Sequence, residues 1–194
     1  IYQGEEIGMT DPEFQEMTDY VDIETHNAYK ELKAKNLPHE EIMEIIKSKS
    51  RDNSRTPMQW TNEENAGFTS GEPWIKLADN YHQINVEKEQ AEGSIFEFYK
   101  KLIQLRKEMP VISEGSYRGI MMDHPSVYGY VREYEGEQLL VLNHFYSNSV
   151  TLEIPEEFLM KSSRYLIGNG KERSLTTNLE LGPYETIAFY FEAK

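Results

Sequence analysis

Residues 127–145, VYGYVREYEGEQLLVLNHF, decide the fold of the second half of the chain. Val127 to Tyr134 alternates between apolar and polar positions, which is typical of a half-buried strand. Glu135-Gly136-Glu137 then supplies a turn, and Gln138 to Phe145 is an apolar run that fits a second, more buried strand. The stretch therefore predicts an antiparallel hairpin.

Further short strands are predicted beyond this hairpin. Residues 149–154, 163–167 and 185–191 each form a compact run bounded by Gly, Pro, Asn or Ser. Short strands at such spacing favour an antiparallel β-sandwich of about 80 residues. We expect this sandwich to occupy residues 110–194.

The sequence before Pro110 has a helical period instead. Helices are predicted from Asn27 to Lys35, from Glu40 to Lys49, and from a capping Ser94 to Met109. The apolar face of the second helix is predicted to carry Ile42, Ile45 and Ile46. The change of period predicts two domains, residues 1–109 and 110–194, in a chain of the α+β class.

Composition and charge limit the function classes. With 20 basic and 34 acidic residues, the net charge of −14 disfavours nucleic acid and anionic membrane surfaces as partners. No apolar run approaches the roughly 18 residues of a membrane span. A neutral small ligand is the favoured partner.

Cysteine and histidine usage points away from metal and thiol chemistry. The chain has no cysteine, which excludes disulfides and permits a reducing compartment, so a cytoplasmic location is expected. Its five histidines show no metal-ligand spacing. We expect no metal and no cofactor.

A polar and aromatic segment, Arg51 to Trp60, has neither a helical nor a strand period. Hydrogen bonds must hold such a segment in place, either to its own protein or to a ligand. A long irregular loop follows, at Asn65 to Ile75, and loops of this length in a compact domain are commonly functional. Trp60 and Trp74 could stack on a sugar, but packing is the favoured interpretation for both.

Five motifs carry a resemblance across the whole chain. They are Tyr2 to Met9, Arg51 to Trp60, Asn65 to Phe68, Pro73 to Ile75 and Leu102 to Lys107. Together they resemble the C-terminal part of a glycoside hydrolase family 13 α-glucosidase, in the branch of oligo-1,6-glucosidases and trehalose-6-phosphate hydrolases. The resemblance implies that the chain spans about a third of a full-length family member.

The resemblance implies a fold for each segment. Ile1 to Gly8 would be the last strand of a (β/α)8 barrel with its following turn, and Met9 to about Asn85 the long loop after it. Ser94 to Met109 would be the last barrel helix. Residues from Pro110 onward would be the C-terminal β-sandwich, in agreement with the change of period.

The resemblance also implies a chemistry that this chain cannot complete. Family members are retaining enzymes with an aspartate nucleophile, a glutamate acid/base and a second aspartate, none of which matches a motif here. The neighbouring Glu5 and Glu6 point in opposite directions in an extended chain, so they cannot flank one bond; a role in holding the loop is favoured. We therefore expect no catalytic residue in the chain, an inactive fragment and a hydrolase as its parent, with the rest of the barrel as partner. The alternative is a non-catalytic β-sandwich module that stabilises the barrel or binds glycans.

The resemblance implies two substrate-binding residues. Arg51 would hold two hydroxyls of the terminal glucosyl unit of a small oligosaccharide or sugar-phosphate substrate, oriented by an aspartate from elsewhere in the barrel. The alternative is an ion pair that braces the loop, which is the favoured role of Arg55. Glu24 would reach the acceptor sugar or, alternatively, serve as a carboxylate at a helix entry. Val21 stands where relatives carry an arginine, which puts the geometry of this loop in question.

Overall fold

The computed structural model describes residues 1–193. The chain forms two compact units, Ile1–Lys100 and Lys101–Lys194, and each is described by itself. Among the described residues, no helix has both the length and the apolar character needed to cross a membrane.

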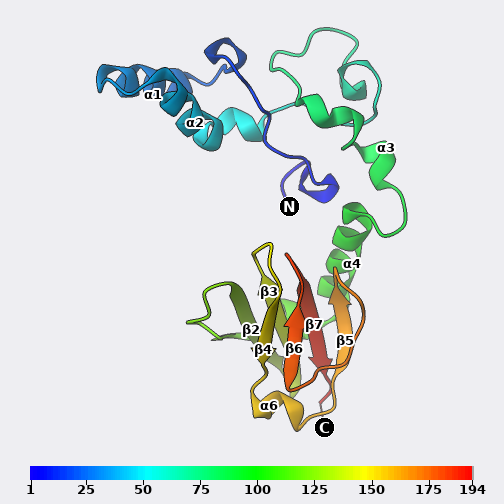
Figure 1. Cartoon of the computed structure of the whole chain (residues 1–194). Coiled ribbons are helices and arrows are strands. Elements are labelled where there is room, and N and C mark those ends of the chain that lie inside the picture. Colours follow the sequence, from blue (N-terminus) through cyan, green and yellow to red (C-terminus); the bar gives the residue numbers. More distant parts are fainter. Residues whose placement is uncertain (194) are drawn as a thin grey trace. The chain divides into compact units, whose positions relative to one another are not determined.

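The first unit is built around two helices, α1 (Ile23–Ala34) and α2 (His39–Lys49), which pack against each other (Figure 1). Their shared core consists of Phe14, Tyr20, Ile42, Met43, Ile46 and Ile75. The helix predicted at residues 40–49 is confirmed, but Ile45 is 37% exposed and Met43 is buried in its place. Because each helical residue advances by about 100°, a face centred near Ile46 includes Met43 and turns Ile45 outward.

Helix α1 begins four positions earlier than predicted, at Ile23 rather than Asn27. Asp22 is its N-cap, and the Asp22 carboxylate accepts a hydrogen bond from the Thr25 backbone N–H at 3.1 Å. The first turn of the helix is polar, so the spacing of apolar residues did not reveal where the helix starts. Glu24 consequently lies inside the first turn of α1.

Residues 1–8 were expected to form the end of a barrel strand and its following turn; the described chain has the turn but no strand here. Glu5–Ile7 is a 3-10 helix, flanked by Gly4 and Gly8 at φ of 90° and 69°. A strand requires the ladder hydrogen bonds of a neighbouring strand, and both sheets of the chain lie in its second unit. The carboxylates of Glu5 and Glu6 accept hydrogen bonds from the backbone N–H groups of Tyr2 and Gly4, at 3.0 and 2.8 Å. Both carboxylates thus hold the turn, as predicted.

Short helices connect the remaining parts of the first unit. The 3-10 helices are Met17–Asp19, Arg51–Ser54, Glu64–Gly67 and Asp79–His82, and α3 is Val86–Glu89. Trp60 and Trp74, for which packing was favoured, are 47% and 69% exposed in this chain. The packing interpretation is therefore wrong for both side chains within the described residues.

Helix α4 (Ile95–Glu108) confirms the helix predicted from Ser94. The Ser94 hydroxyl accepts a hydrogen bond from the Glu97 N–H at 3.2 Å, which is the expected cap. The division between the two units falls within this helix. A short helix that was not predicted, α5 (Pro110–Ser113), follows with proline at its first position, where the missing N–H costs nothing.

The second unit contains two antiparallel sheets (Figure 1). The larger sheet has the order β1-β2-β3-β7-β5, formed by Ser116–Ile120, Val127–Tyr134, Glu137–His144, Thr186–Phe191 and Arg164–Gly168. The smaller sheet pairs β4 (Val150–Glu153) with β6 (Asn178–Leu181), and α6 (Glu156–Leu159) follows β4. Side chains of both sheets share one buried core, which includes Leu140, Leu142, Leu152, Leu179, Leu181 and Phe189. The predicted antiparallel sandwich is confirmed.

The hairpin that decides this fold forms as predicted. Tyr134 pairs with Glu137, and the two turn residues Glu135 and Gly136 both have positive φ, 48° and 90°. This is the primed turn that matches the twist of the flanking strands. Strands β1 and β6 were not predicted, because β1 contains a glycine and is mostly exposed, and β6 has only four residues.

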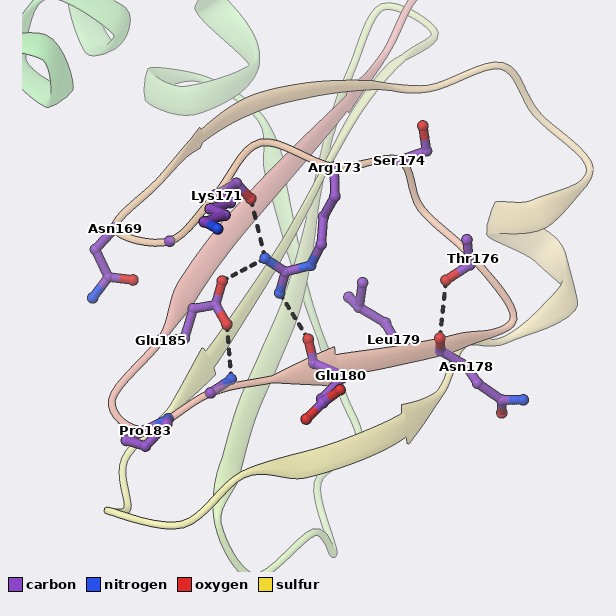
Figure 2. Close-up of a pocket in the computed structure, with 12 residues that line it drawn as sticks. Asn169, Lys171, Arg173, Ser174, Thr176, Asn178, Leu179, Glu180, Pro183 and Glu185 are labelled. Atoms are coloured by element: carbon purple, nitrogen blue, oxygen red, sulfur yellow. Dashed lines mark hydrogen bonds and ion pairs between the residues drawn. The ribbon is translucent and has the colours of Figure 1, made fainter.

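One arginine ties a loop of the second unit to its strands, beside a hollow of about 680 Å³ (Figure 2). The Arg173 guanidinium donates to the Glu185 carboxylate, to the Glu180 carbonyl oxygen at 2.7 Å and to the Lys171 carbonyl oxygen at 3.1 Å. Glu185 also accepts the Gly182 N–H at 2.7 Å. These bonds fix the loop to β6 and to the residue before β7, so the charges of Arg173 and Glu185 serve the structure.

Candidate substrate-binding site

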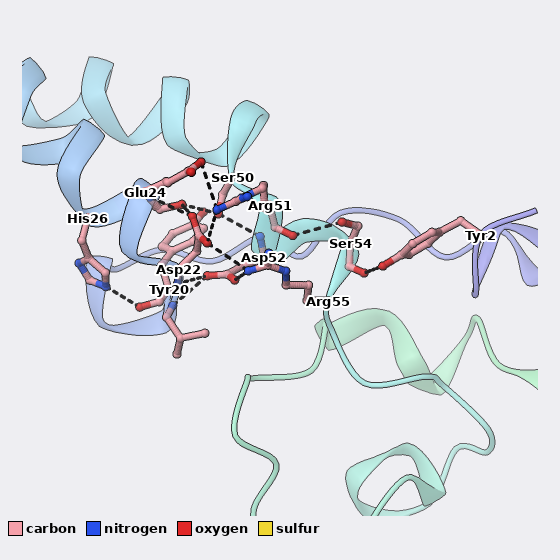
Figure 3. Close-up of polar contacts among 12 residues, drawn as sticks. Tyr2, Tyr20, Asp22, Glu24, His26, Ser50, Arg51, Asp52, Ser54 and Arg55 are labelled. Carbon is pink, nitrogen blue, oxygen red and sulfur yellow. Dashed lines mark hydrogen bonds and ion pairs between the residues drawn. The ribbon is translucent and has the colours of Figure 1, made fainter.

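Two buried carboxylates join the start of α1 to the segment that follows α2 (Figure 3). Asp52 is fully buried, and its Oδ2 accepts hydrogen bonds from the backbone N–H groups of Val21 and Asp22 at 2.8 and 2.9 Å. The Ser50 hydroxyl accepts the Asp52 N–H at 3.2 Å and lies 2.9 Å from the Thr25 hydroxyl. Segments about thirty positions apart are thereby held as one structure.

This arrangement answers the question raised by Val21. The Asp52 carboxylate binds the backbone N–H of residue 21, a group that every residue except proline provides. The Val21 side chain itself is exposed. The loop geometry therefore does not require the arginine that the resemblance implied at this position.

Asp22 uses its two carboxylate oxygens for two different tasks. Oδ2 caps α1, and Oδ1 accepts a hydrogen bond at 3.1 Å from each of two guanidinium groups, those of Arg51 and Arg55. Burial opposes ionisation of this carboxyl, but the Thr25 N–H and the two arginines outweigh burial and hold the pKa of Asp22 below its ordinary value. The group is a buried anion compensated by donors from three residues.

Arg51 and Glu24, the two predicted substrate-binding residues, lie together. The Nη2 atom of Arg51 is 3.1 Å from Oδ1 of Asp22 and 3.1 Å from Oε2 of Glu24. The Arg51 side chain is 51% exposed and that of Glu24 69% exposed, so both can meet a ligand. Within this chain, Asp22 and Glu24 are the carboxylates that contact Arg51; the aspartate from elsewhere in the barrel stays a prediction.

Arg55 braces the loop, as predicted. Its Nη1 donates to Asp22 Oδ1 at 3.1 Å and lies 3.6 Å from Oδ1 of the buried Asp52. One guanidinium thus sits against two buried carboxylates, which would otherwise repel each other. The two arginines of the segment consequently differ in role: Arg55 joins buried anions, and Arg51 extends toward solvent.

Sequence reasoning missed Asp22 and Asp52 as members of this site. Asp22 carried a recognisable signal, because an aspartate three positions before Thr25 can cap a helix. Asp52 carried none, since its partners are backbone N–H groups. Within residues 1–193, no group of three or more His, Asp or Glu side chains is arranged to hold a metal ion.

The chemistry offered by the exposed pair is hydrogen bonding to hydroxyl groups. A guanidinium presents several donors in a planar fork, and a carboxylate accepts from hydroxyls. In the described chain the polar contacts of the Arg51 side chain use Nη2, which leaves Nε and Nη1 for a ligand. A neutral polyol such as a sugar fits these groups.

Residues 1–115 match the family model of the alpha-amylase catalytic domain. The chain belongs to the alpha-amylase family. Residues 127–188 match the model of the C-terminal domain of the alpha-amylase SusG, and this range lies within the β-sandwich of the second unit. The alpha-amylase family fold thus accounts for both units of the chain.

Individual members of the alpha-amylase family are similar in sequence to nearly the whole of this chain. A trehalose-6-phosphate hydrolase of Bacillus subtilis is 42% identical over 97% of this chain, and an oligo-1,6-glucosidase of Halalkalibacterium halodurans is 45% identical over 97%. The crystal structure of a trehalose-6-phosphate hydrolase of Bacillus licheniformis matches 100% of this chain at 44% identity, with a TM-score of 0.94. This chain covers 34% of each of the two curated relatives and 36% of the solved structure, so it spans about a third of their length.

Proposed function

We propose that this chain supplies the sugar-binding half of an α-glucosidase active site, with Arg51 and Glu24 as substrate contacts. The observation that carries the proposal is the joint placement of these two exposed side chains, 3.1 Å apart, on a base of buried ionic contacts. A rigid base is what a binding arginine needs, because a free side chain of this length loses much conformational entropy when it binds. Arg51 would bind hydroxyls of the terminal glucosyl unit, and Glu24 would bind the acceptor sugar.

The parent enzyme that we propose hydrolyses α-glucosidic bonds of short oligosaccharides or of trehalose-6-phosphate with retention of configuration. The named relatives, two hydrolases of this kind, support the reaction type. Retention requires two carboxyl groups about 5 Å apart around the anomeric carbon. In our proposal those groups belong to the rest of the barrel, which is therefore the partner of this chain. The cytoplasmic location stays a prediction.

The first test is an activity assay on this chain alone. Incubation with isomaltose, and separately with trehalose-6-phosphate, should release no glucose, whereas the full-length protein should release glucose from one of them. The same comparison of kcat/KM in the full-length protein identifies which substrate class it prefers. Glucose release by the pure 194-residue chain would contradict the proposed division of the active site.

The second test is kinetic and concerns Arg51 in the full-length protein. Arg51→Ala should lower kcat/KM by roughly 5- to 150-fold, the equivalent of about 1–3 kcal/mol for a charge-assisted hydrogen bond. Glu24→Gln should mainly affect substrates with a bulky acceptor sugar. Glu31→Gln, an exposed change on the same helix, is the matched control and should leave kcat/KM unchanged. A kinetically silent Arg51→Ala variant would assign Arg51 to the bracing role.

A further inference from the structure

We propose that Asp22 is a positioning residue, which sets the orientation of both substrate-binding side chains through its two carboxylate oxygens. The inference rests on the proposed function of Arg51 and Glu24. Asp22 itself is 7% exposed, and Thr25, Arg51 and Arg55 occupy its oxygens. It therefore acts through other groups and not on the substrate.

The first oxygen fixes Arg51. Oδ1 is 3.1 Å from Nη2 of Arg51, and the same oxygen accepts from the brace Arg55 at 3.1 Å. Arg55 also contacts the fully buried Asp52. Arg55 is therefore fixed in place, and it in turn fixes Oδ1 of Asp22. The half-exposed guanidinium of Arg51 is thereby anchored at one nitrogen, Nη2.

The second oxygen fixes Glu24. Oδ2 accepts the Thr25 N–H at 3.1 Å and lies 3.4 Å from the Thr25 hydroxyl, which closes the first turn of α1 around Glu24. A capped first turn restricts the backbone from which the Glu24 side chain projects. The Glu24 carboxylate then reaches the same Nη2 atom of Arg51 at 3.1 Å. One buried carboxylate thus determines the spacing of the pair.

The test is a double-mutant cycle in the full-length protein. Asp22→Asn retains a side-chain oxygen that can cap α1, but it removes the charge that holds Arg51. We expect Asp22→Asn to lower kcat/KM about 5- to 30-fold, and to have less than a twofold effect when added to Arg51→Ala, because the residue on which it acts is then absent. Asp79→Asn, at an exposed aspartate of the same unit, should leave kcat/KM unchanged.

The outcomes separate this inference from the proposed function. If Arg51→Ala retains the original kcat/KM, the proposed role of Arg51 fails. If Arg51→Ala is impaired but Asp22→Asn is silent, or lowers kcat/KM by the same factor with and without Arg51, the positioning role is overturned. Should Asp22→Asn not fold, Asp22→Glu provides the second variant: it keeps the charge but displaces the carboxylate, and full kcat/KM in that variant would likewise overturn positioning.

Discussion

The carboxylate of Asp52 accepts a hydrogen bond from the backbone N–H of Asp22 at 2.9 Å, across 30 positions of sequence. Both carboxyl side chains are buried, and the Arg55 guanidinium contacts an oxygen of each. The contact connects the start of α1 with the segment after α2, and so it connects the backbone that carries Glu24 with the backbone that carries Arg51. Stability and proposed function therefore depend on the same few groups in this unit.

Removal of the Asp52 carboxylate should destabilise the first unit strongly. Asp52→Ala leaves two N–H groups, the partly buried one of Val21 and the buried one of Asp22, without their acceptor, and we expect a loss of about 3 kcal/mol in the free energy of unfolding. Urea unfolding of the chain followed by tryptophan fluorescence is a suitable measurement, because both tryptophans lie in the first unit. Asp79→Ala, at an exposed aspartate, should change the stability by less than about 0.5 kcal/mol. Equal urea midpoints for Asp52→Ala and Asp79→Ala would mean that the hydrogen bonds of Asp52 contribute nothing to stability.

Stability of the first unit should fall in acid partly through Asp22. Its pKa is lowered in the folded state, so the stabilisation is complete above the ordinary value of 3.8 and is lost as the pH falls through the folded-state pKa. The stability difference between the original chain and Asp22→Asn should therefore be largest near neutral pH and shrink below about pH 4. Unfolding curves of both proteins between pH 7 and pH 3 measure this difference. A difference that stays constant over that range would show that the charge of Asp22 is not the origin of its effect.

Arg173 and Glu185 should be coupled in the second unit. The pair is mostly buried, with side-chain exposures of 29% and 12%, and each partner also bonds the backbone of the loop or the strand end. A double-mutant cycle with Arg173→Met and Glu185→Gln should give a coupling energy of about 1–3 kcal/mol. Hydrogen exchange of the amides between residues 169 and 185 is the measurement, since loss of the pair should speed exchange there. Additive effects of the two substitutions would argue against coupling.

The parts of the fold that the sequence predicted correctly are those with a strong local period. Strand β2 was predicted with its observed bounds, Val127–Tyr134, because its side chains alternate between a buried face and a more exposed one. Helix α2 begins within one residue of its predicted start for the same kind of reason. The start of α1 was displaced because its first turn is polar and is defined by a cap, Asp22, rather than by apolar side chains.

The candidate site was predictable only in part, for a different physical reason. Arg51 and Glu24 followed from the resemblance, and the structure brings them into contact. Asp52, which lies beneath them, binds backbone N–H groups, which are present at nearly every position and leave no pattern in a sequence. Asp22 had only the local signal of a helix cap, and its contacts with Arg51 and Arg55 join segments about thirty positions apart. Contacts of that kind become visible only when the path of the chain is known.

Two substitutions in the turn between β2 and β3 should change the stability of the second unit in opposite directions. Gly136 has φ of 90°, so Gly136→Ala should reduce the stability of the second unit by about 1–2 kcal/mol. Glu135 has φ of 48°, a conformation that asparagine adopts more readily, so Glu135→Asn should increase stability by about 0.5–1 kcal/mol.

The matched control for this hairpin is Gly182→Ala. Gly182 is not in the left-handed region, and an added Cβ would lie 3.5 Å from the Glu185 carboxylate, an ordinary contact. Its effect should stay within about 0.5 kcal/mol. Amide hydrogen exchange in β2 and β3 measures all three variants in the same unit. A Gly136→Ala variant as stable as the Gly182→Ala control would show that the positive φ of the turn is not required for the hairpin.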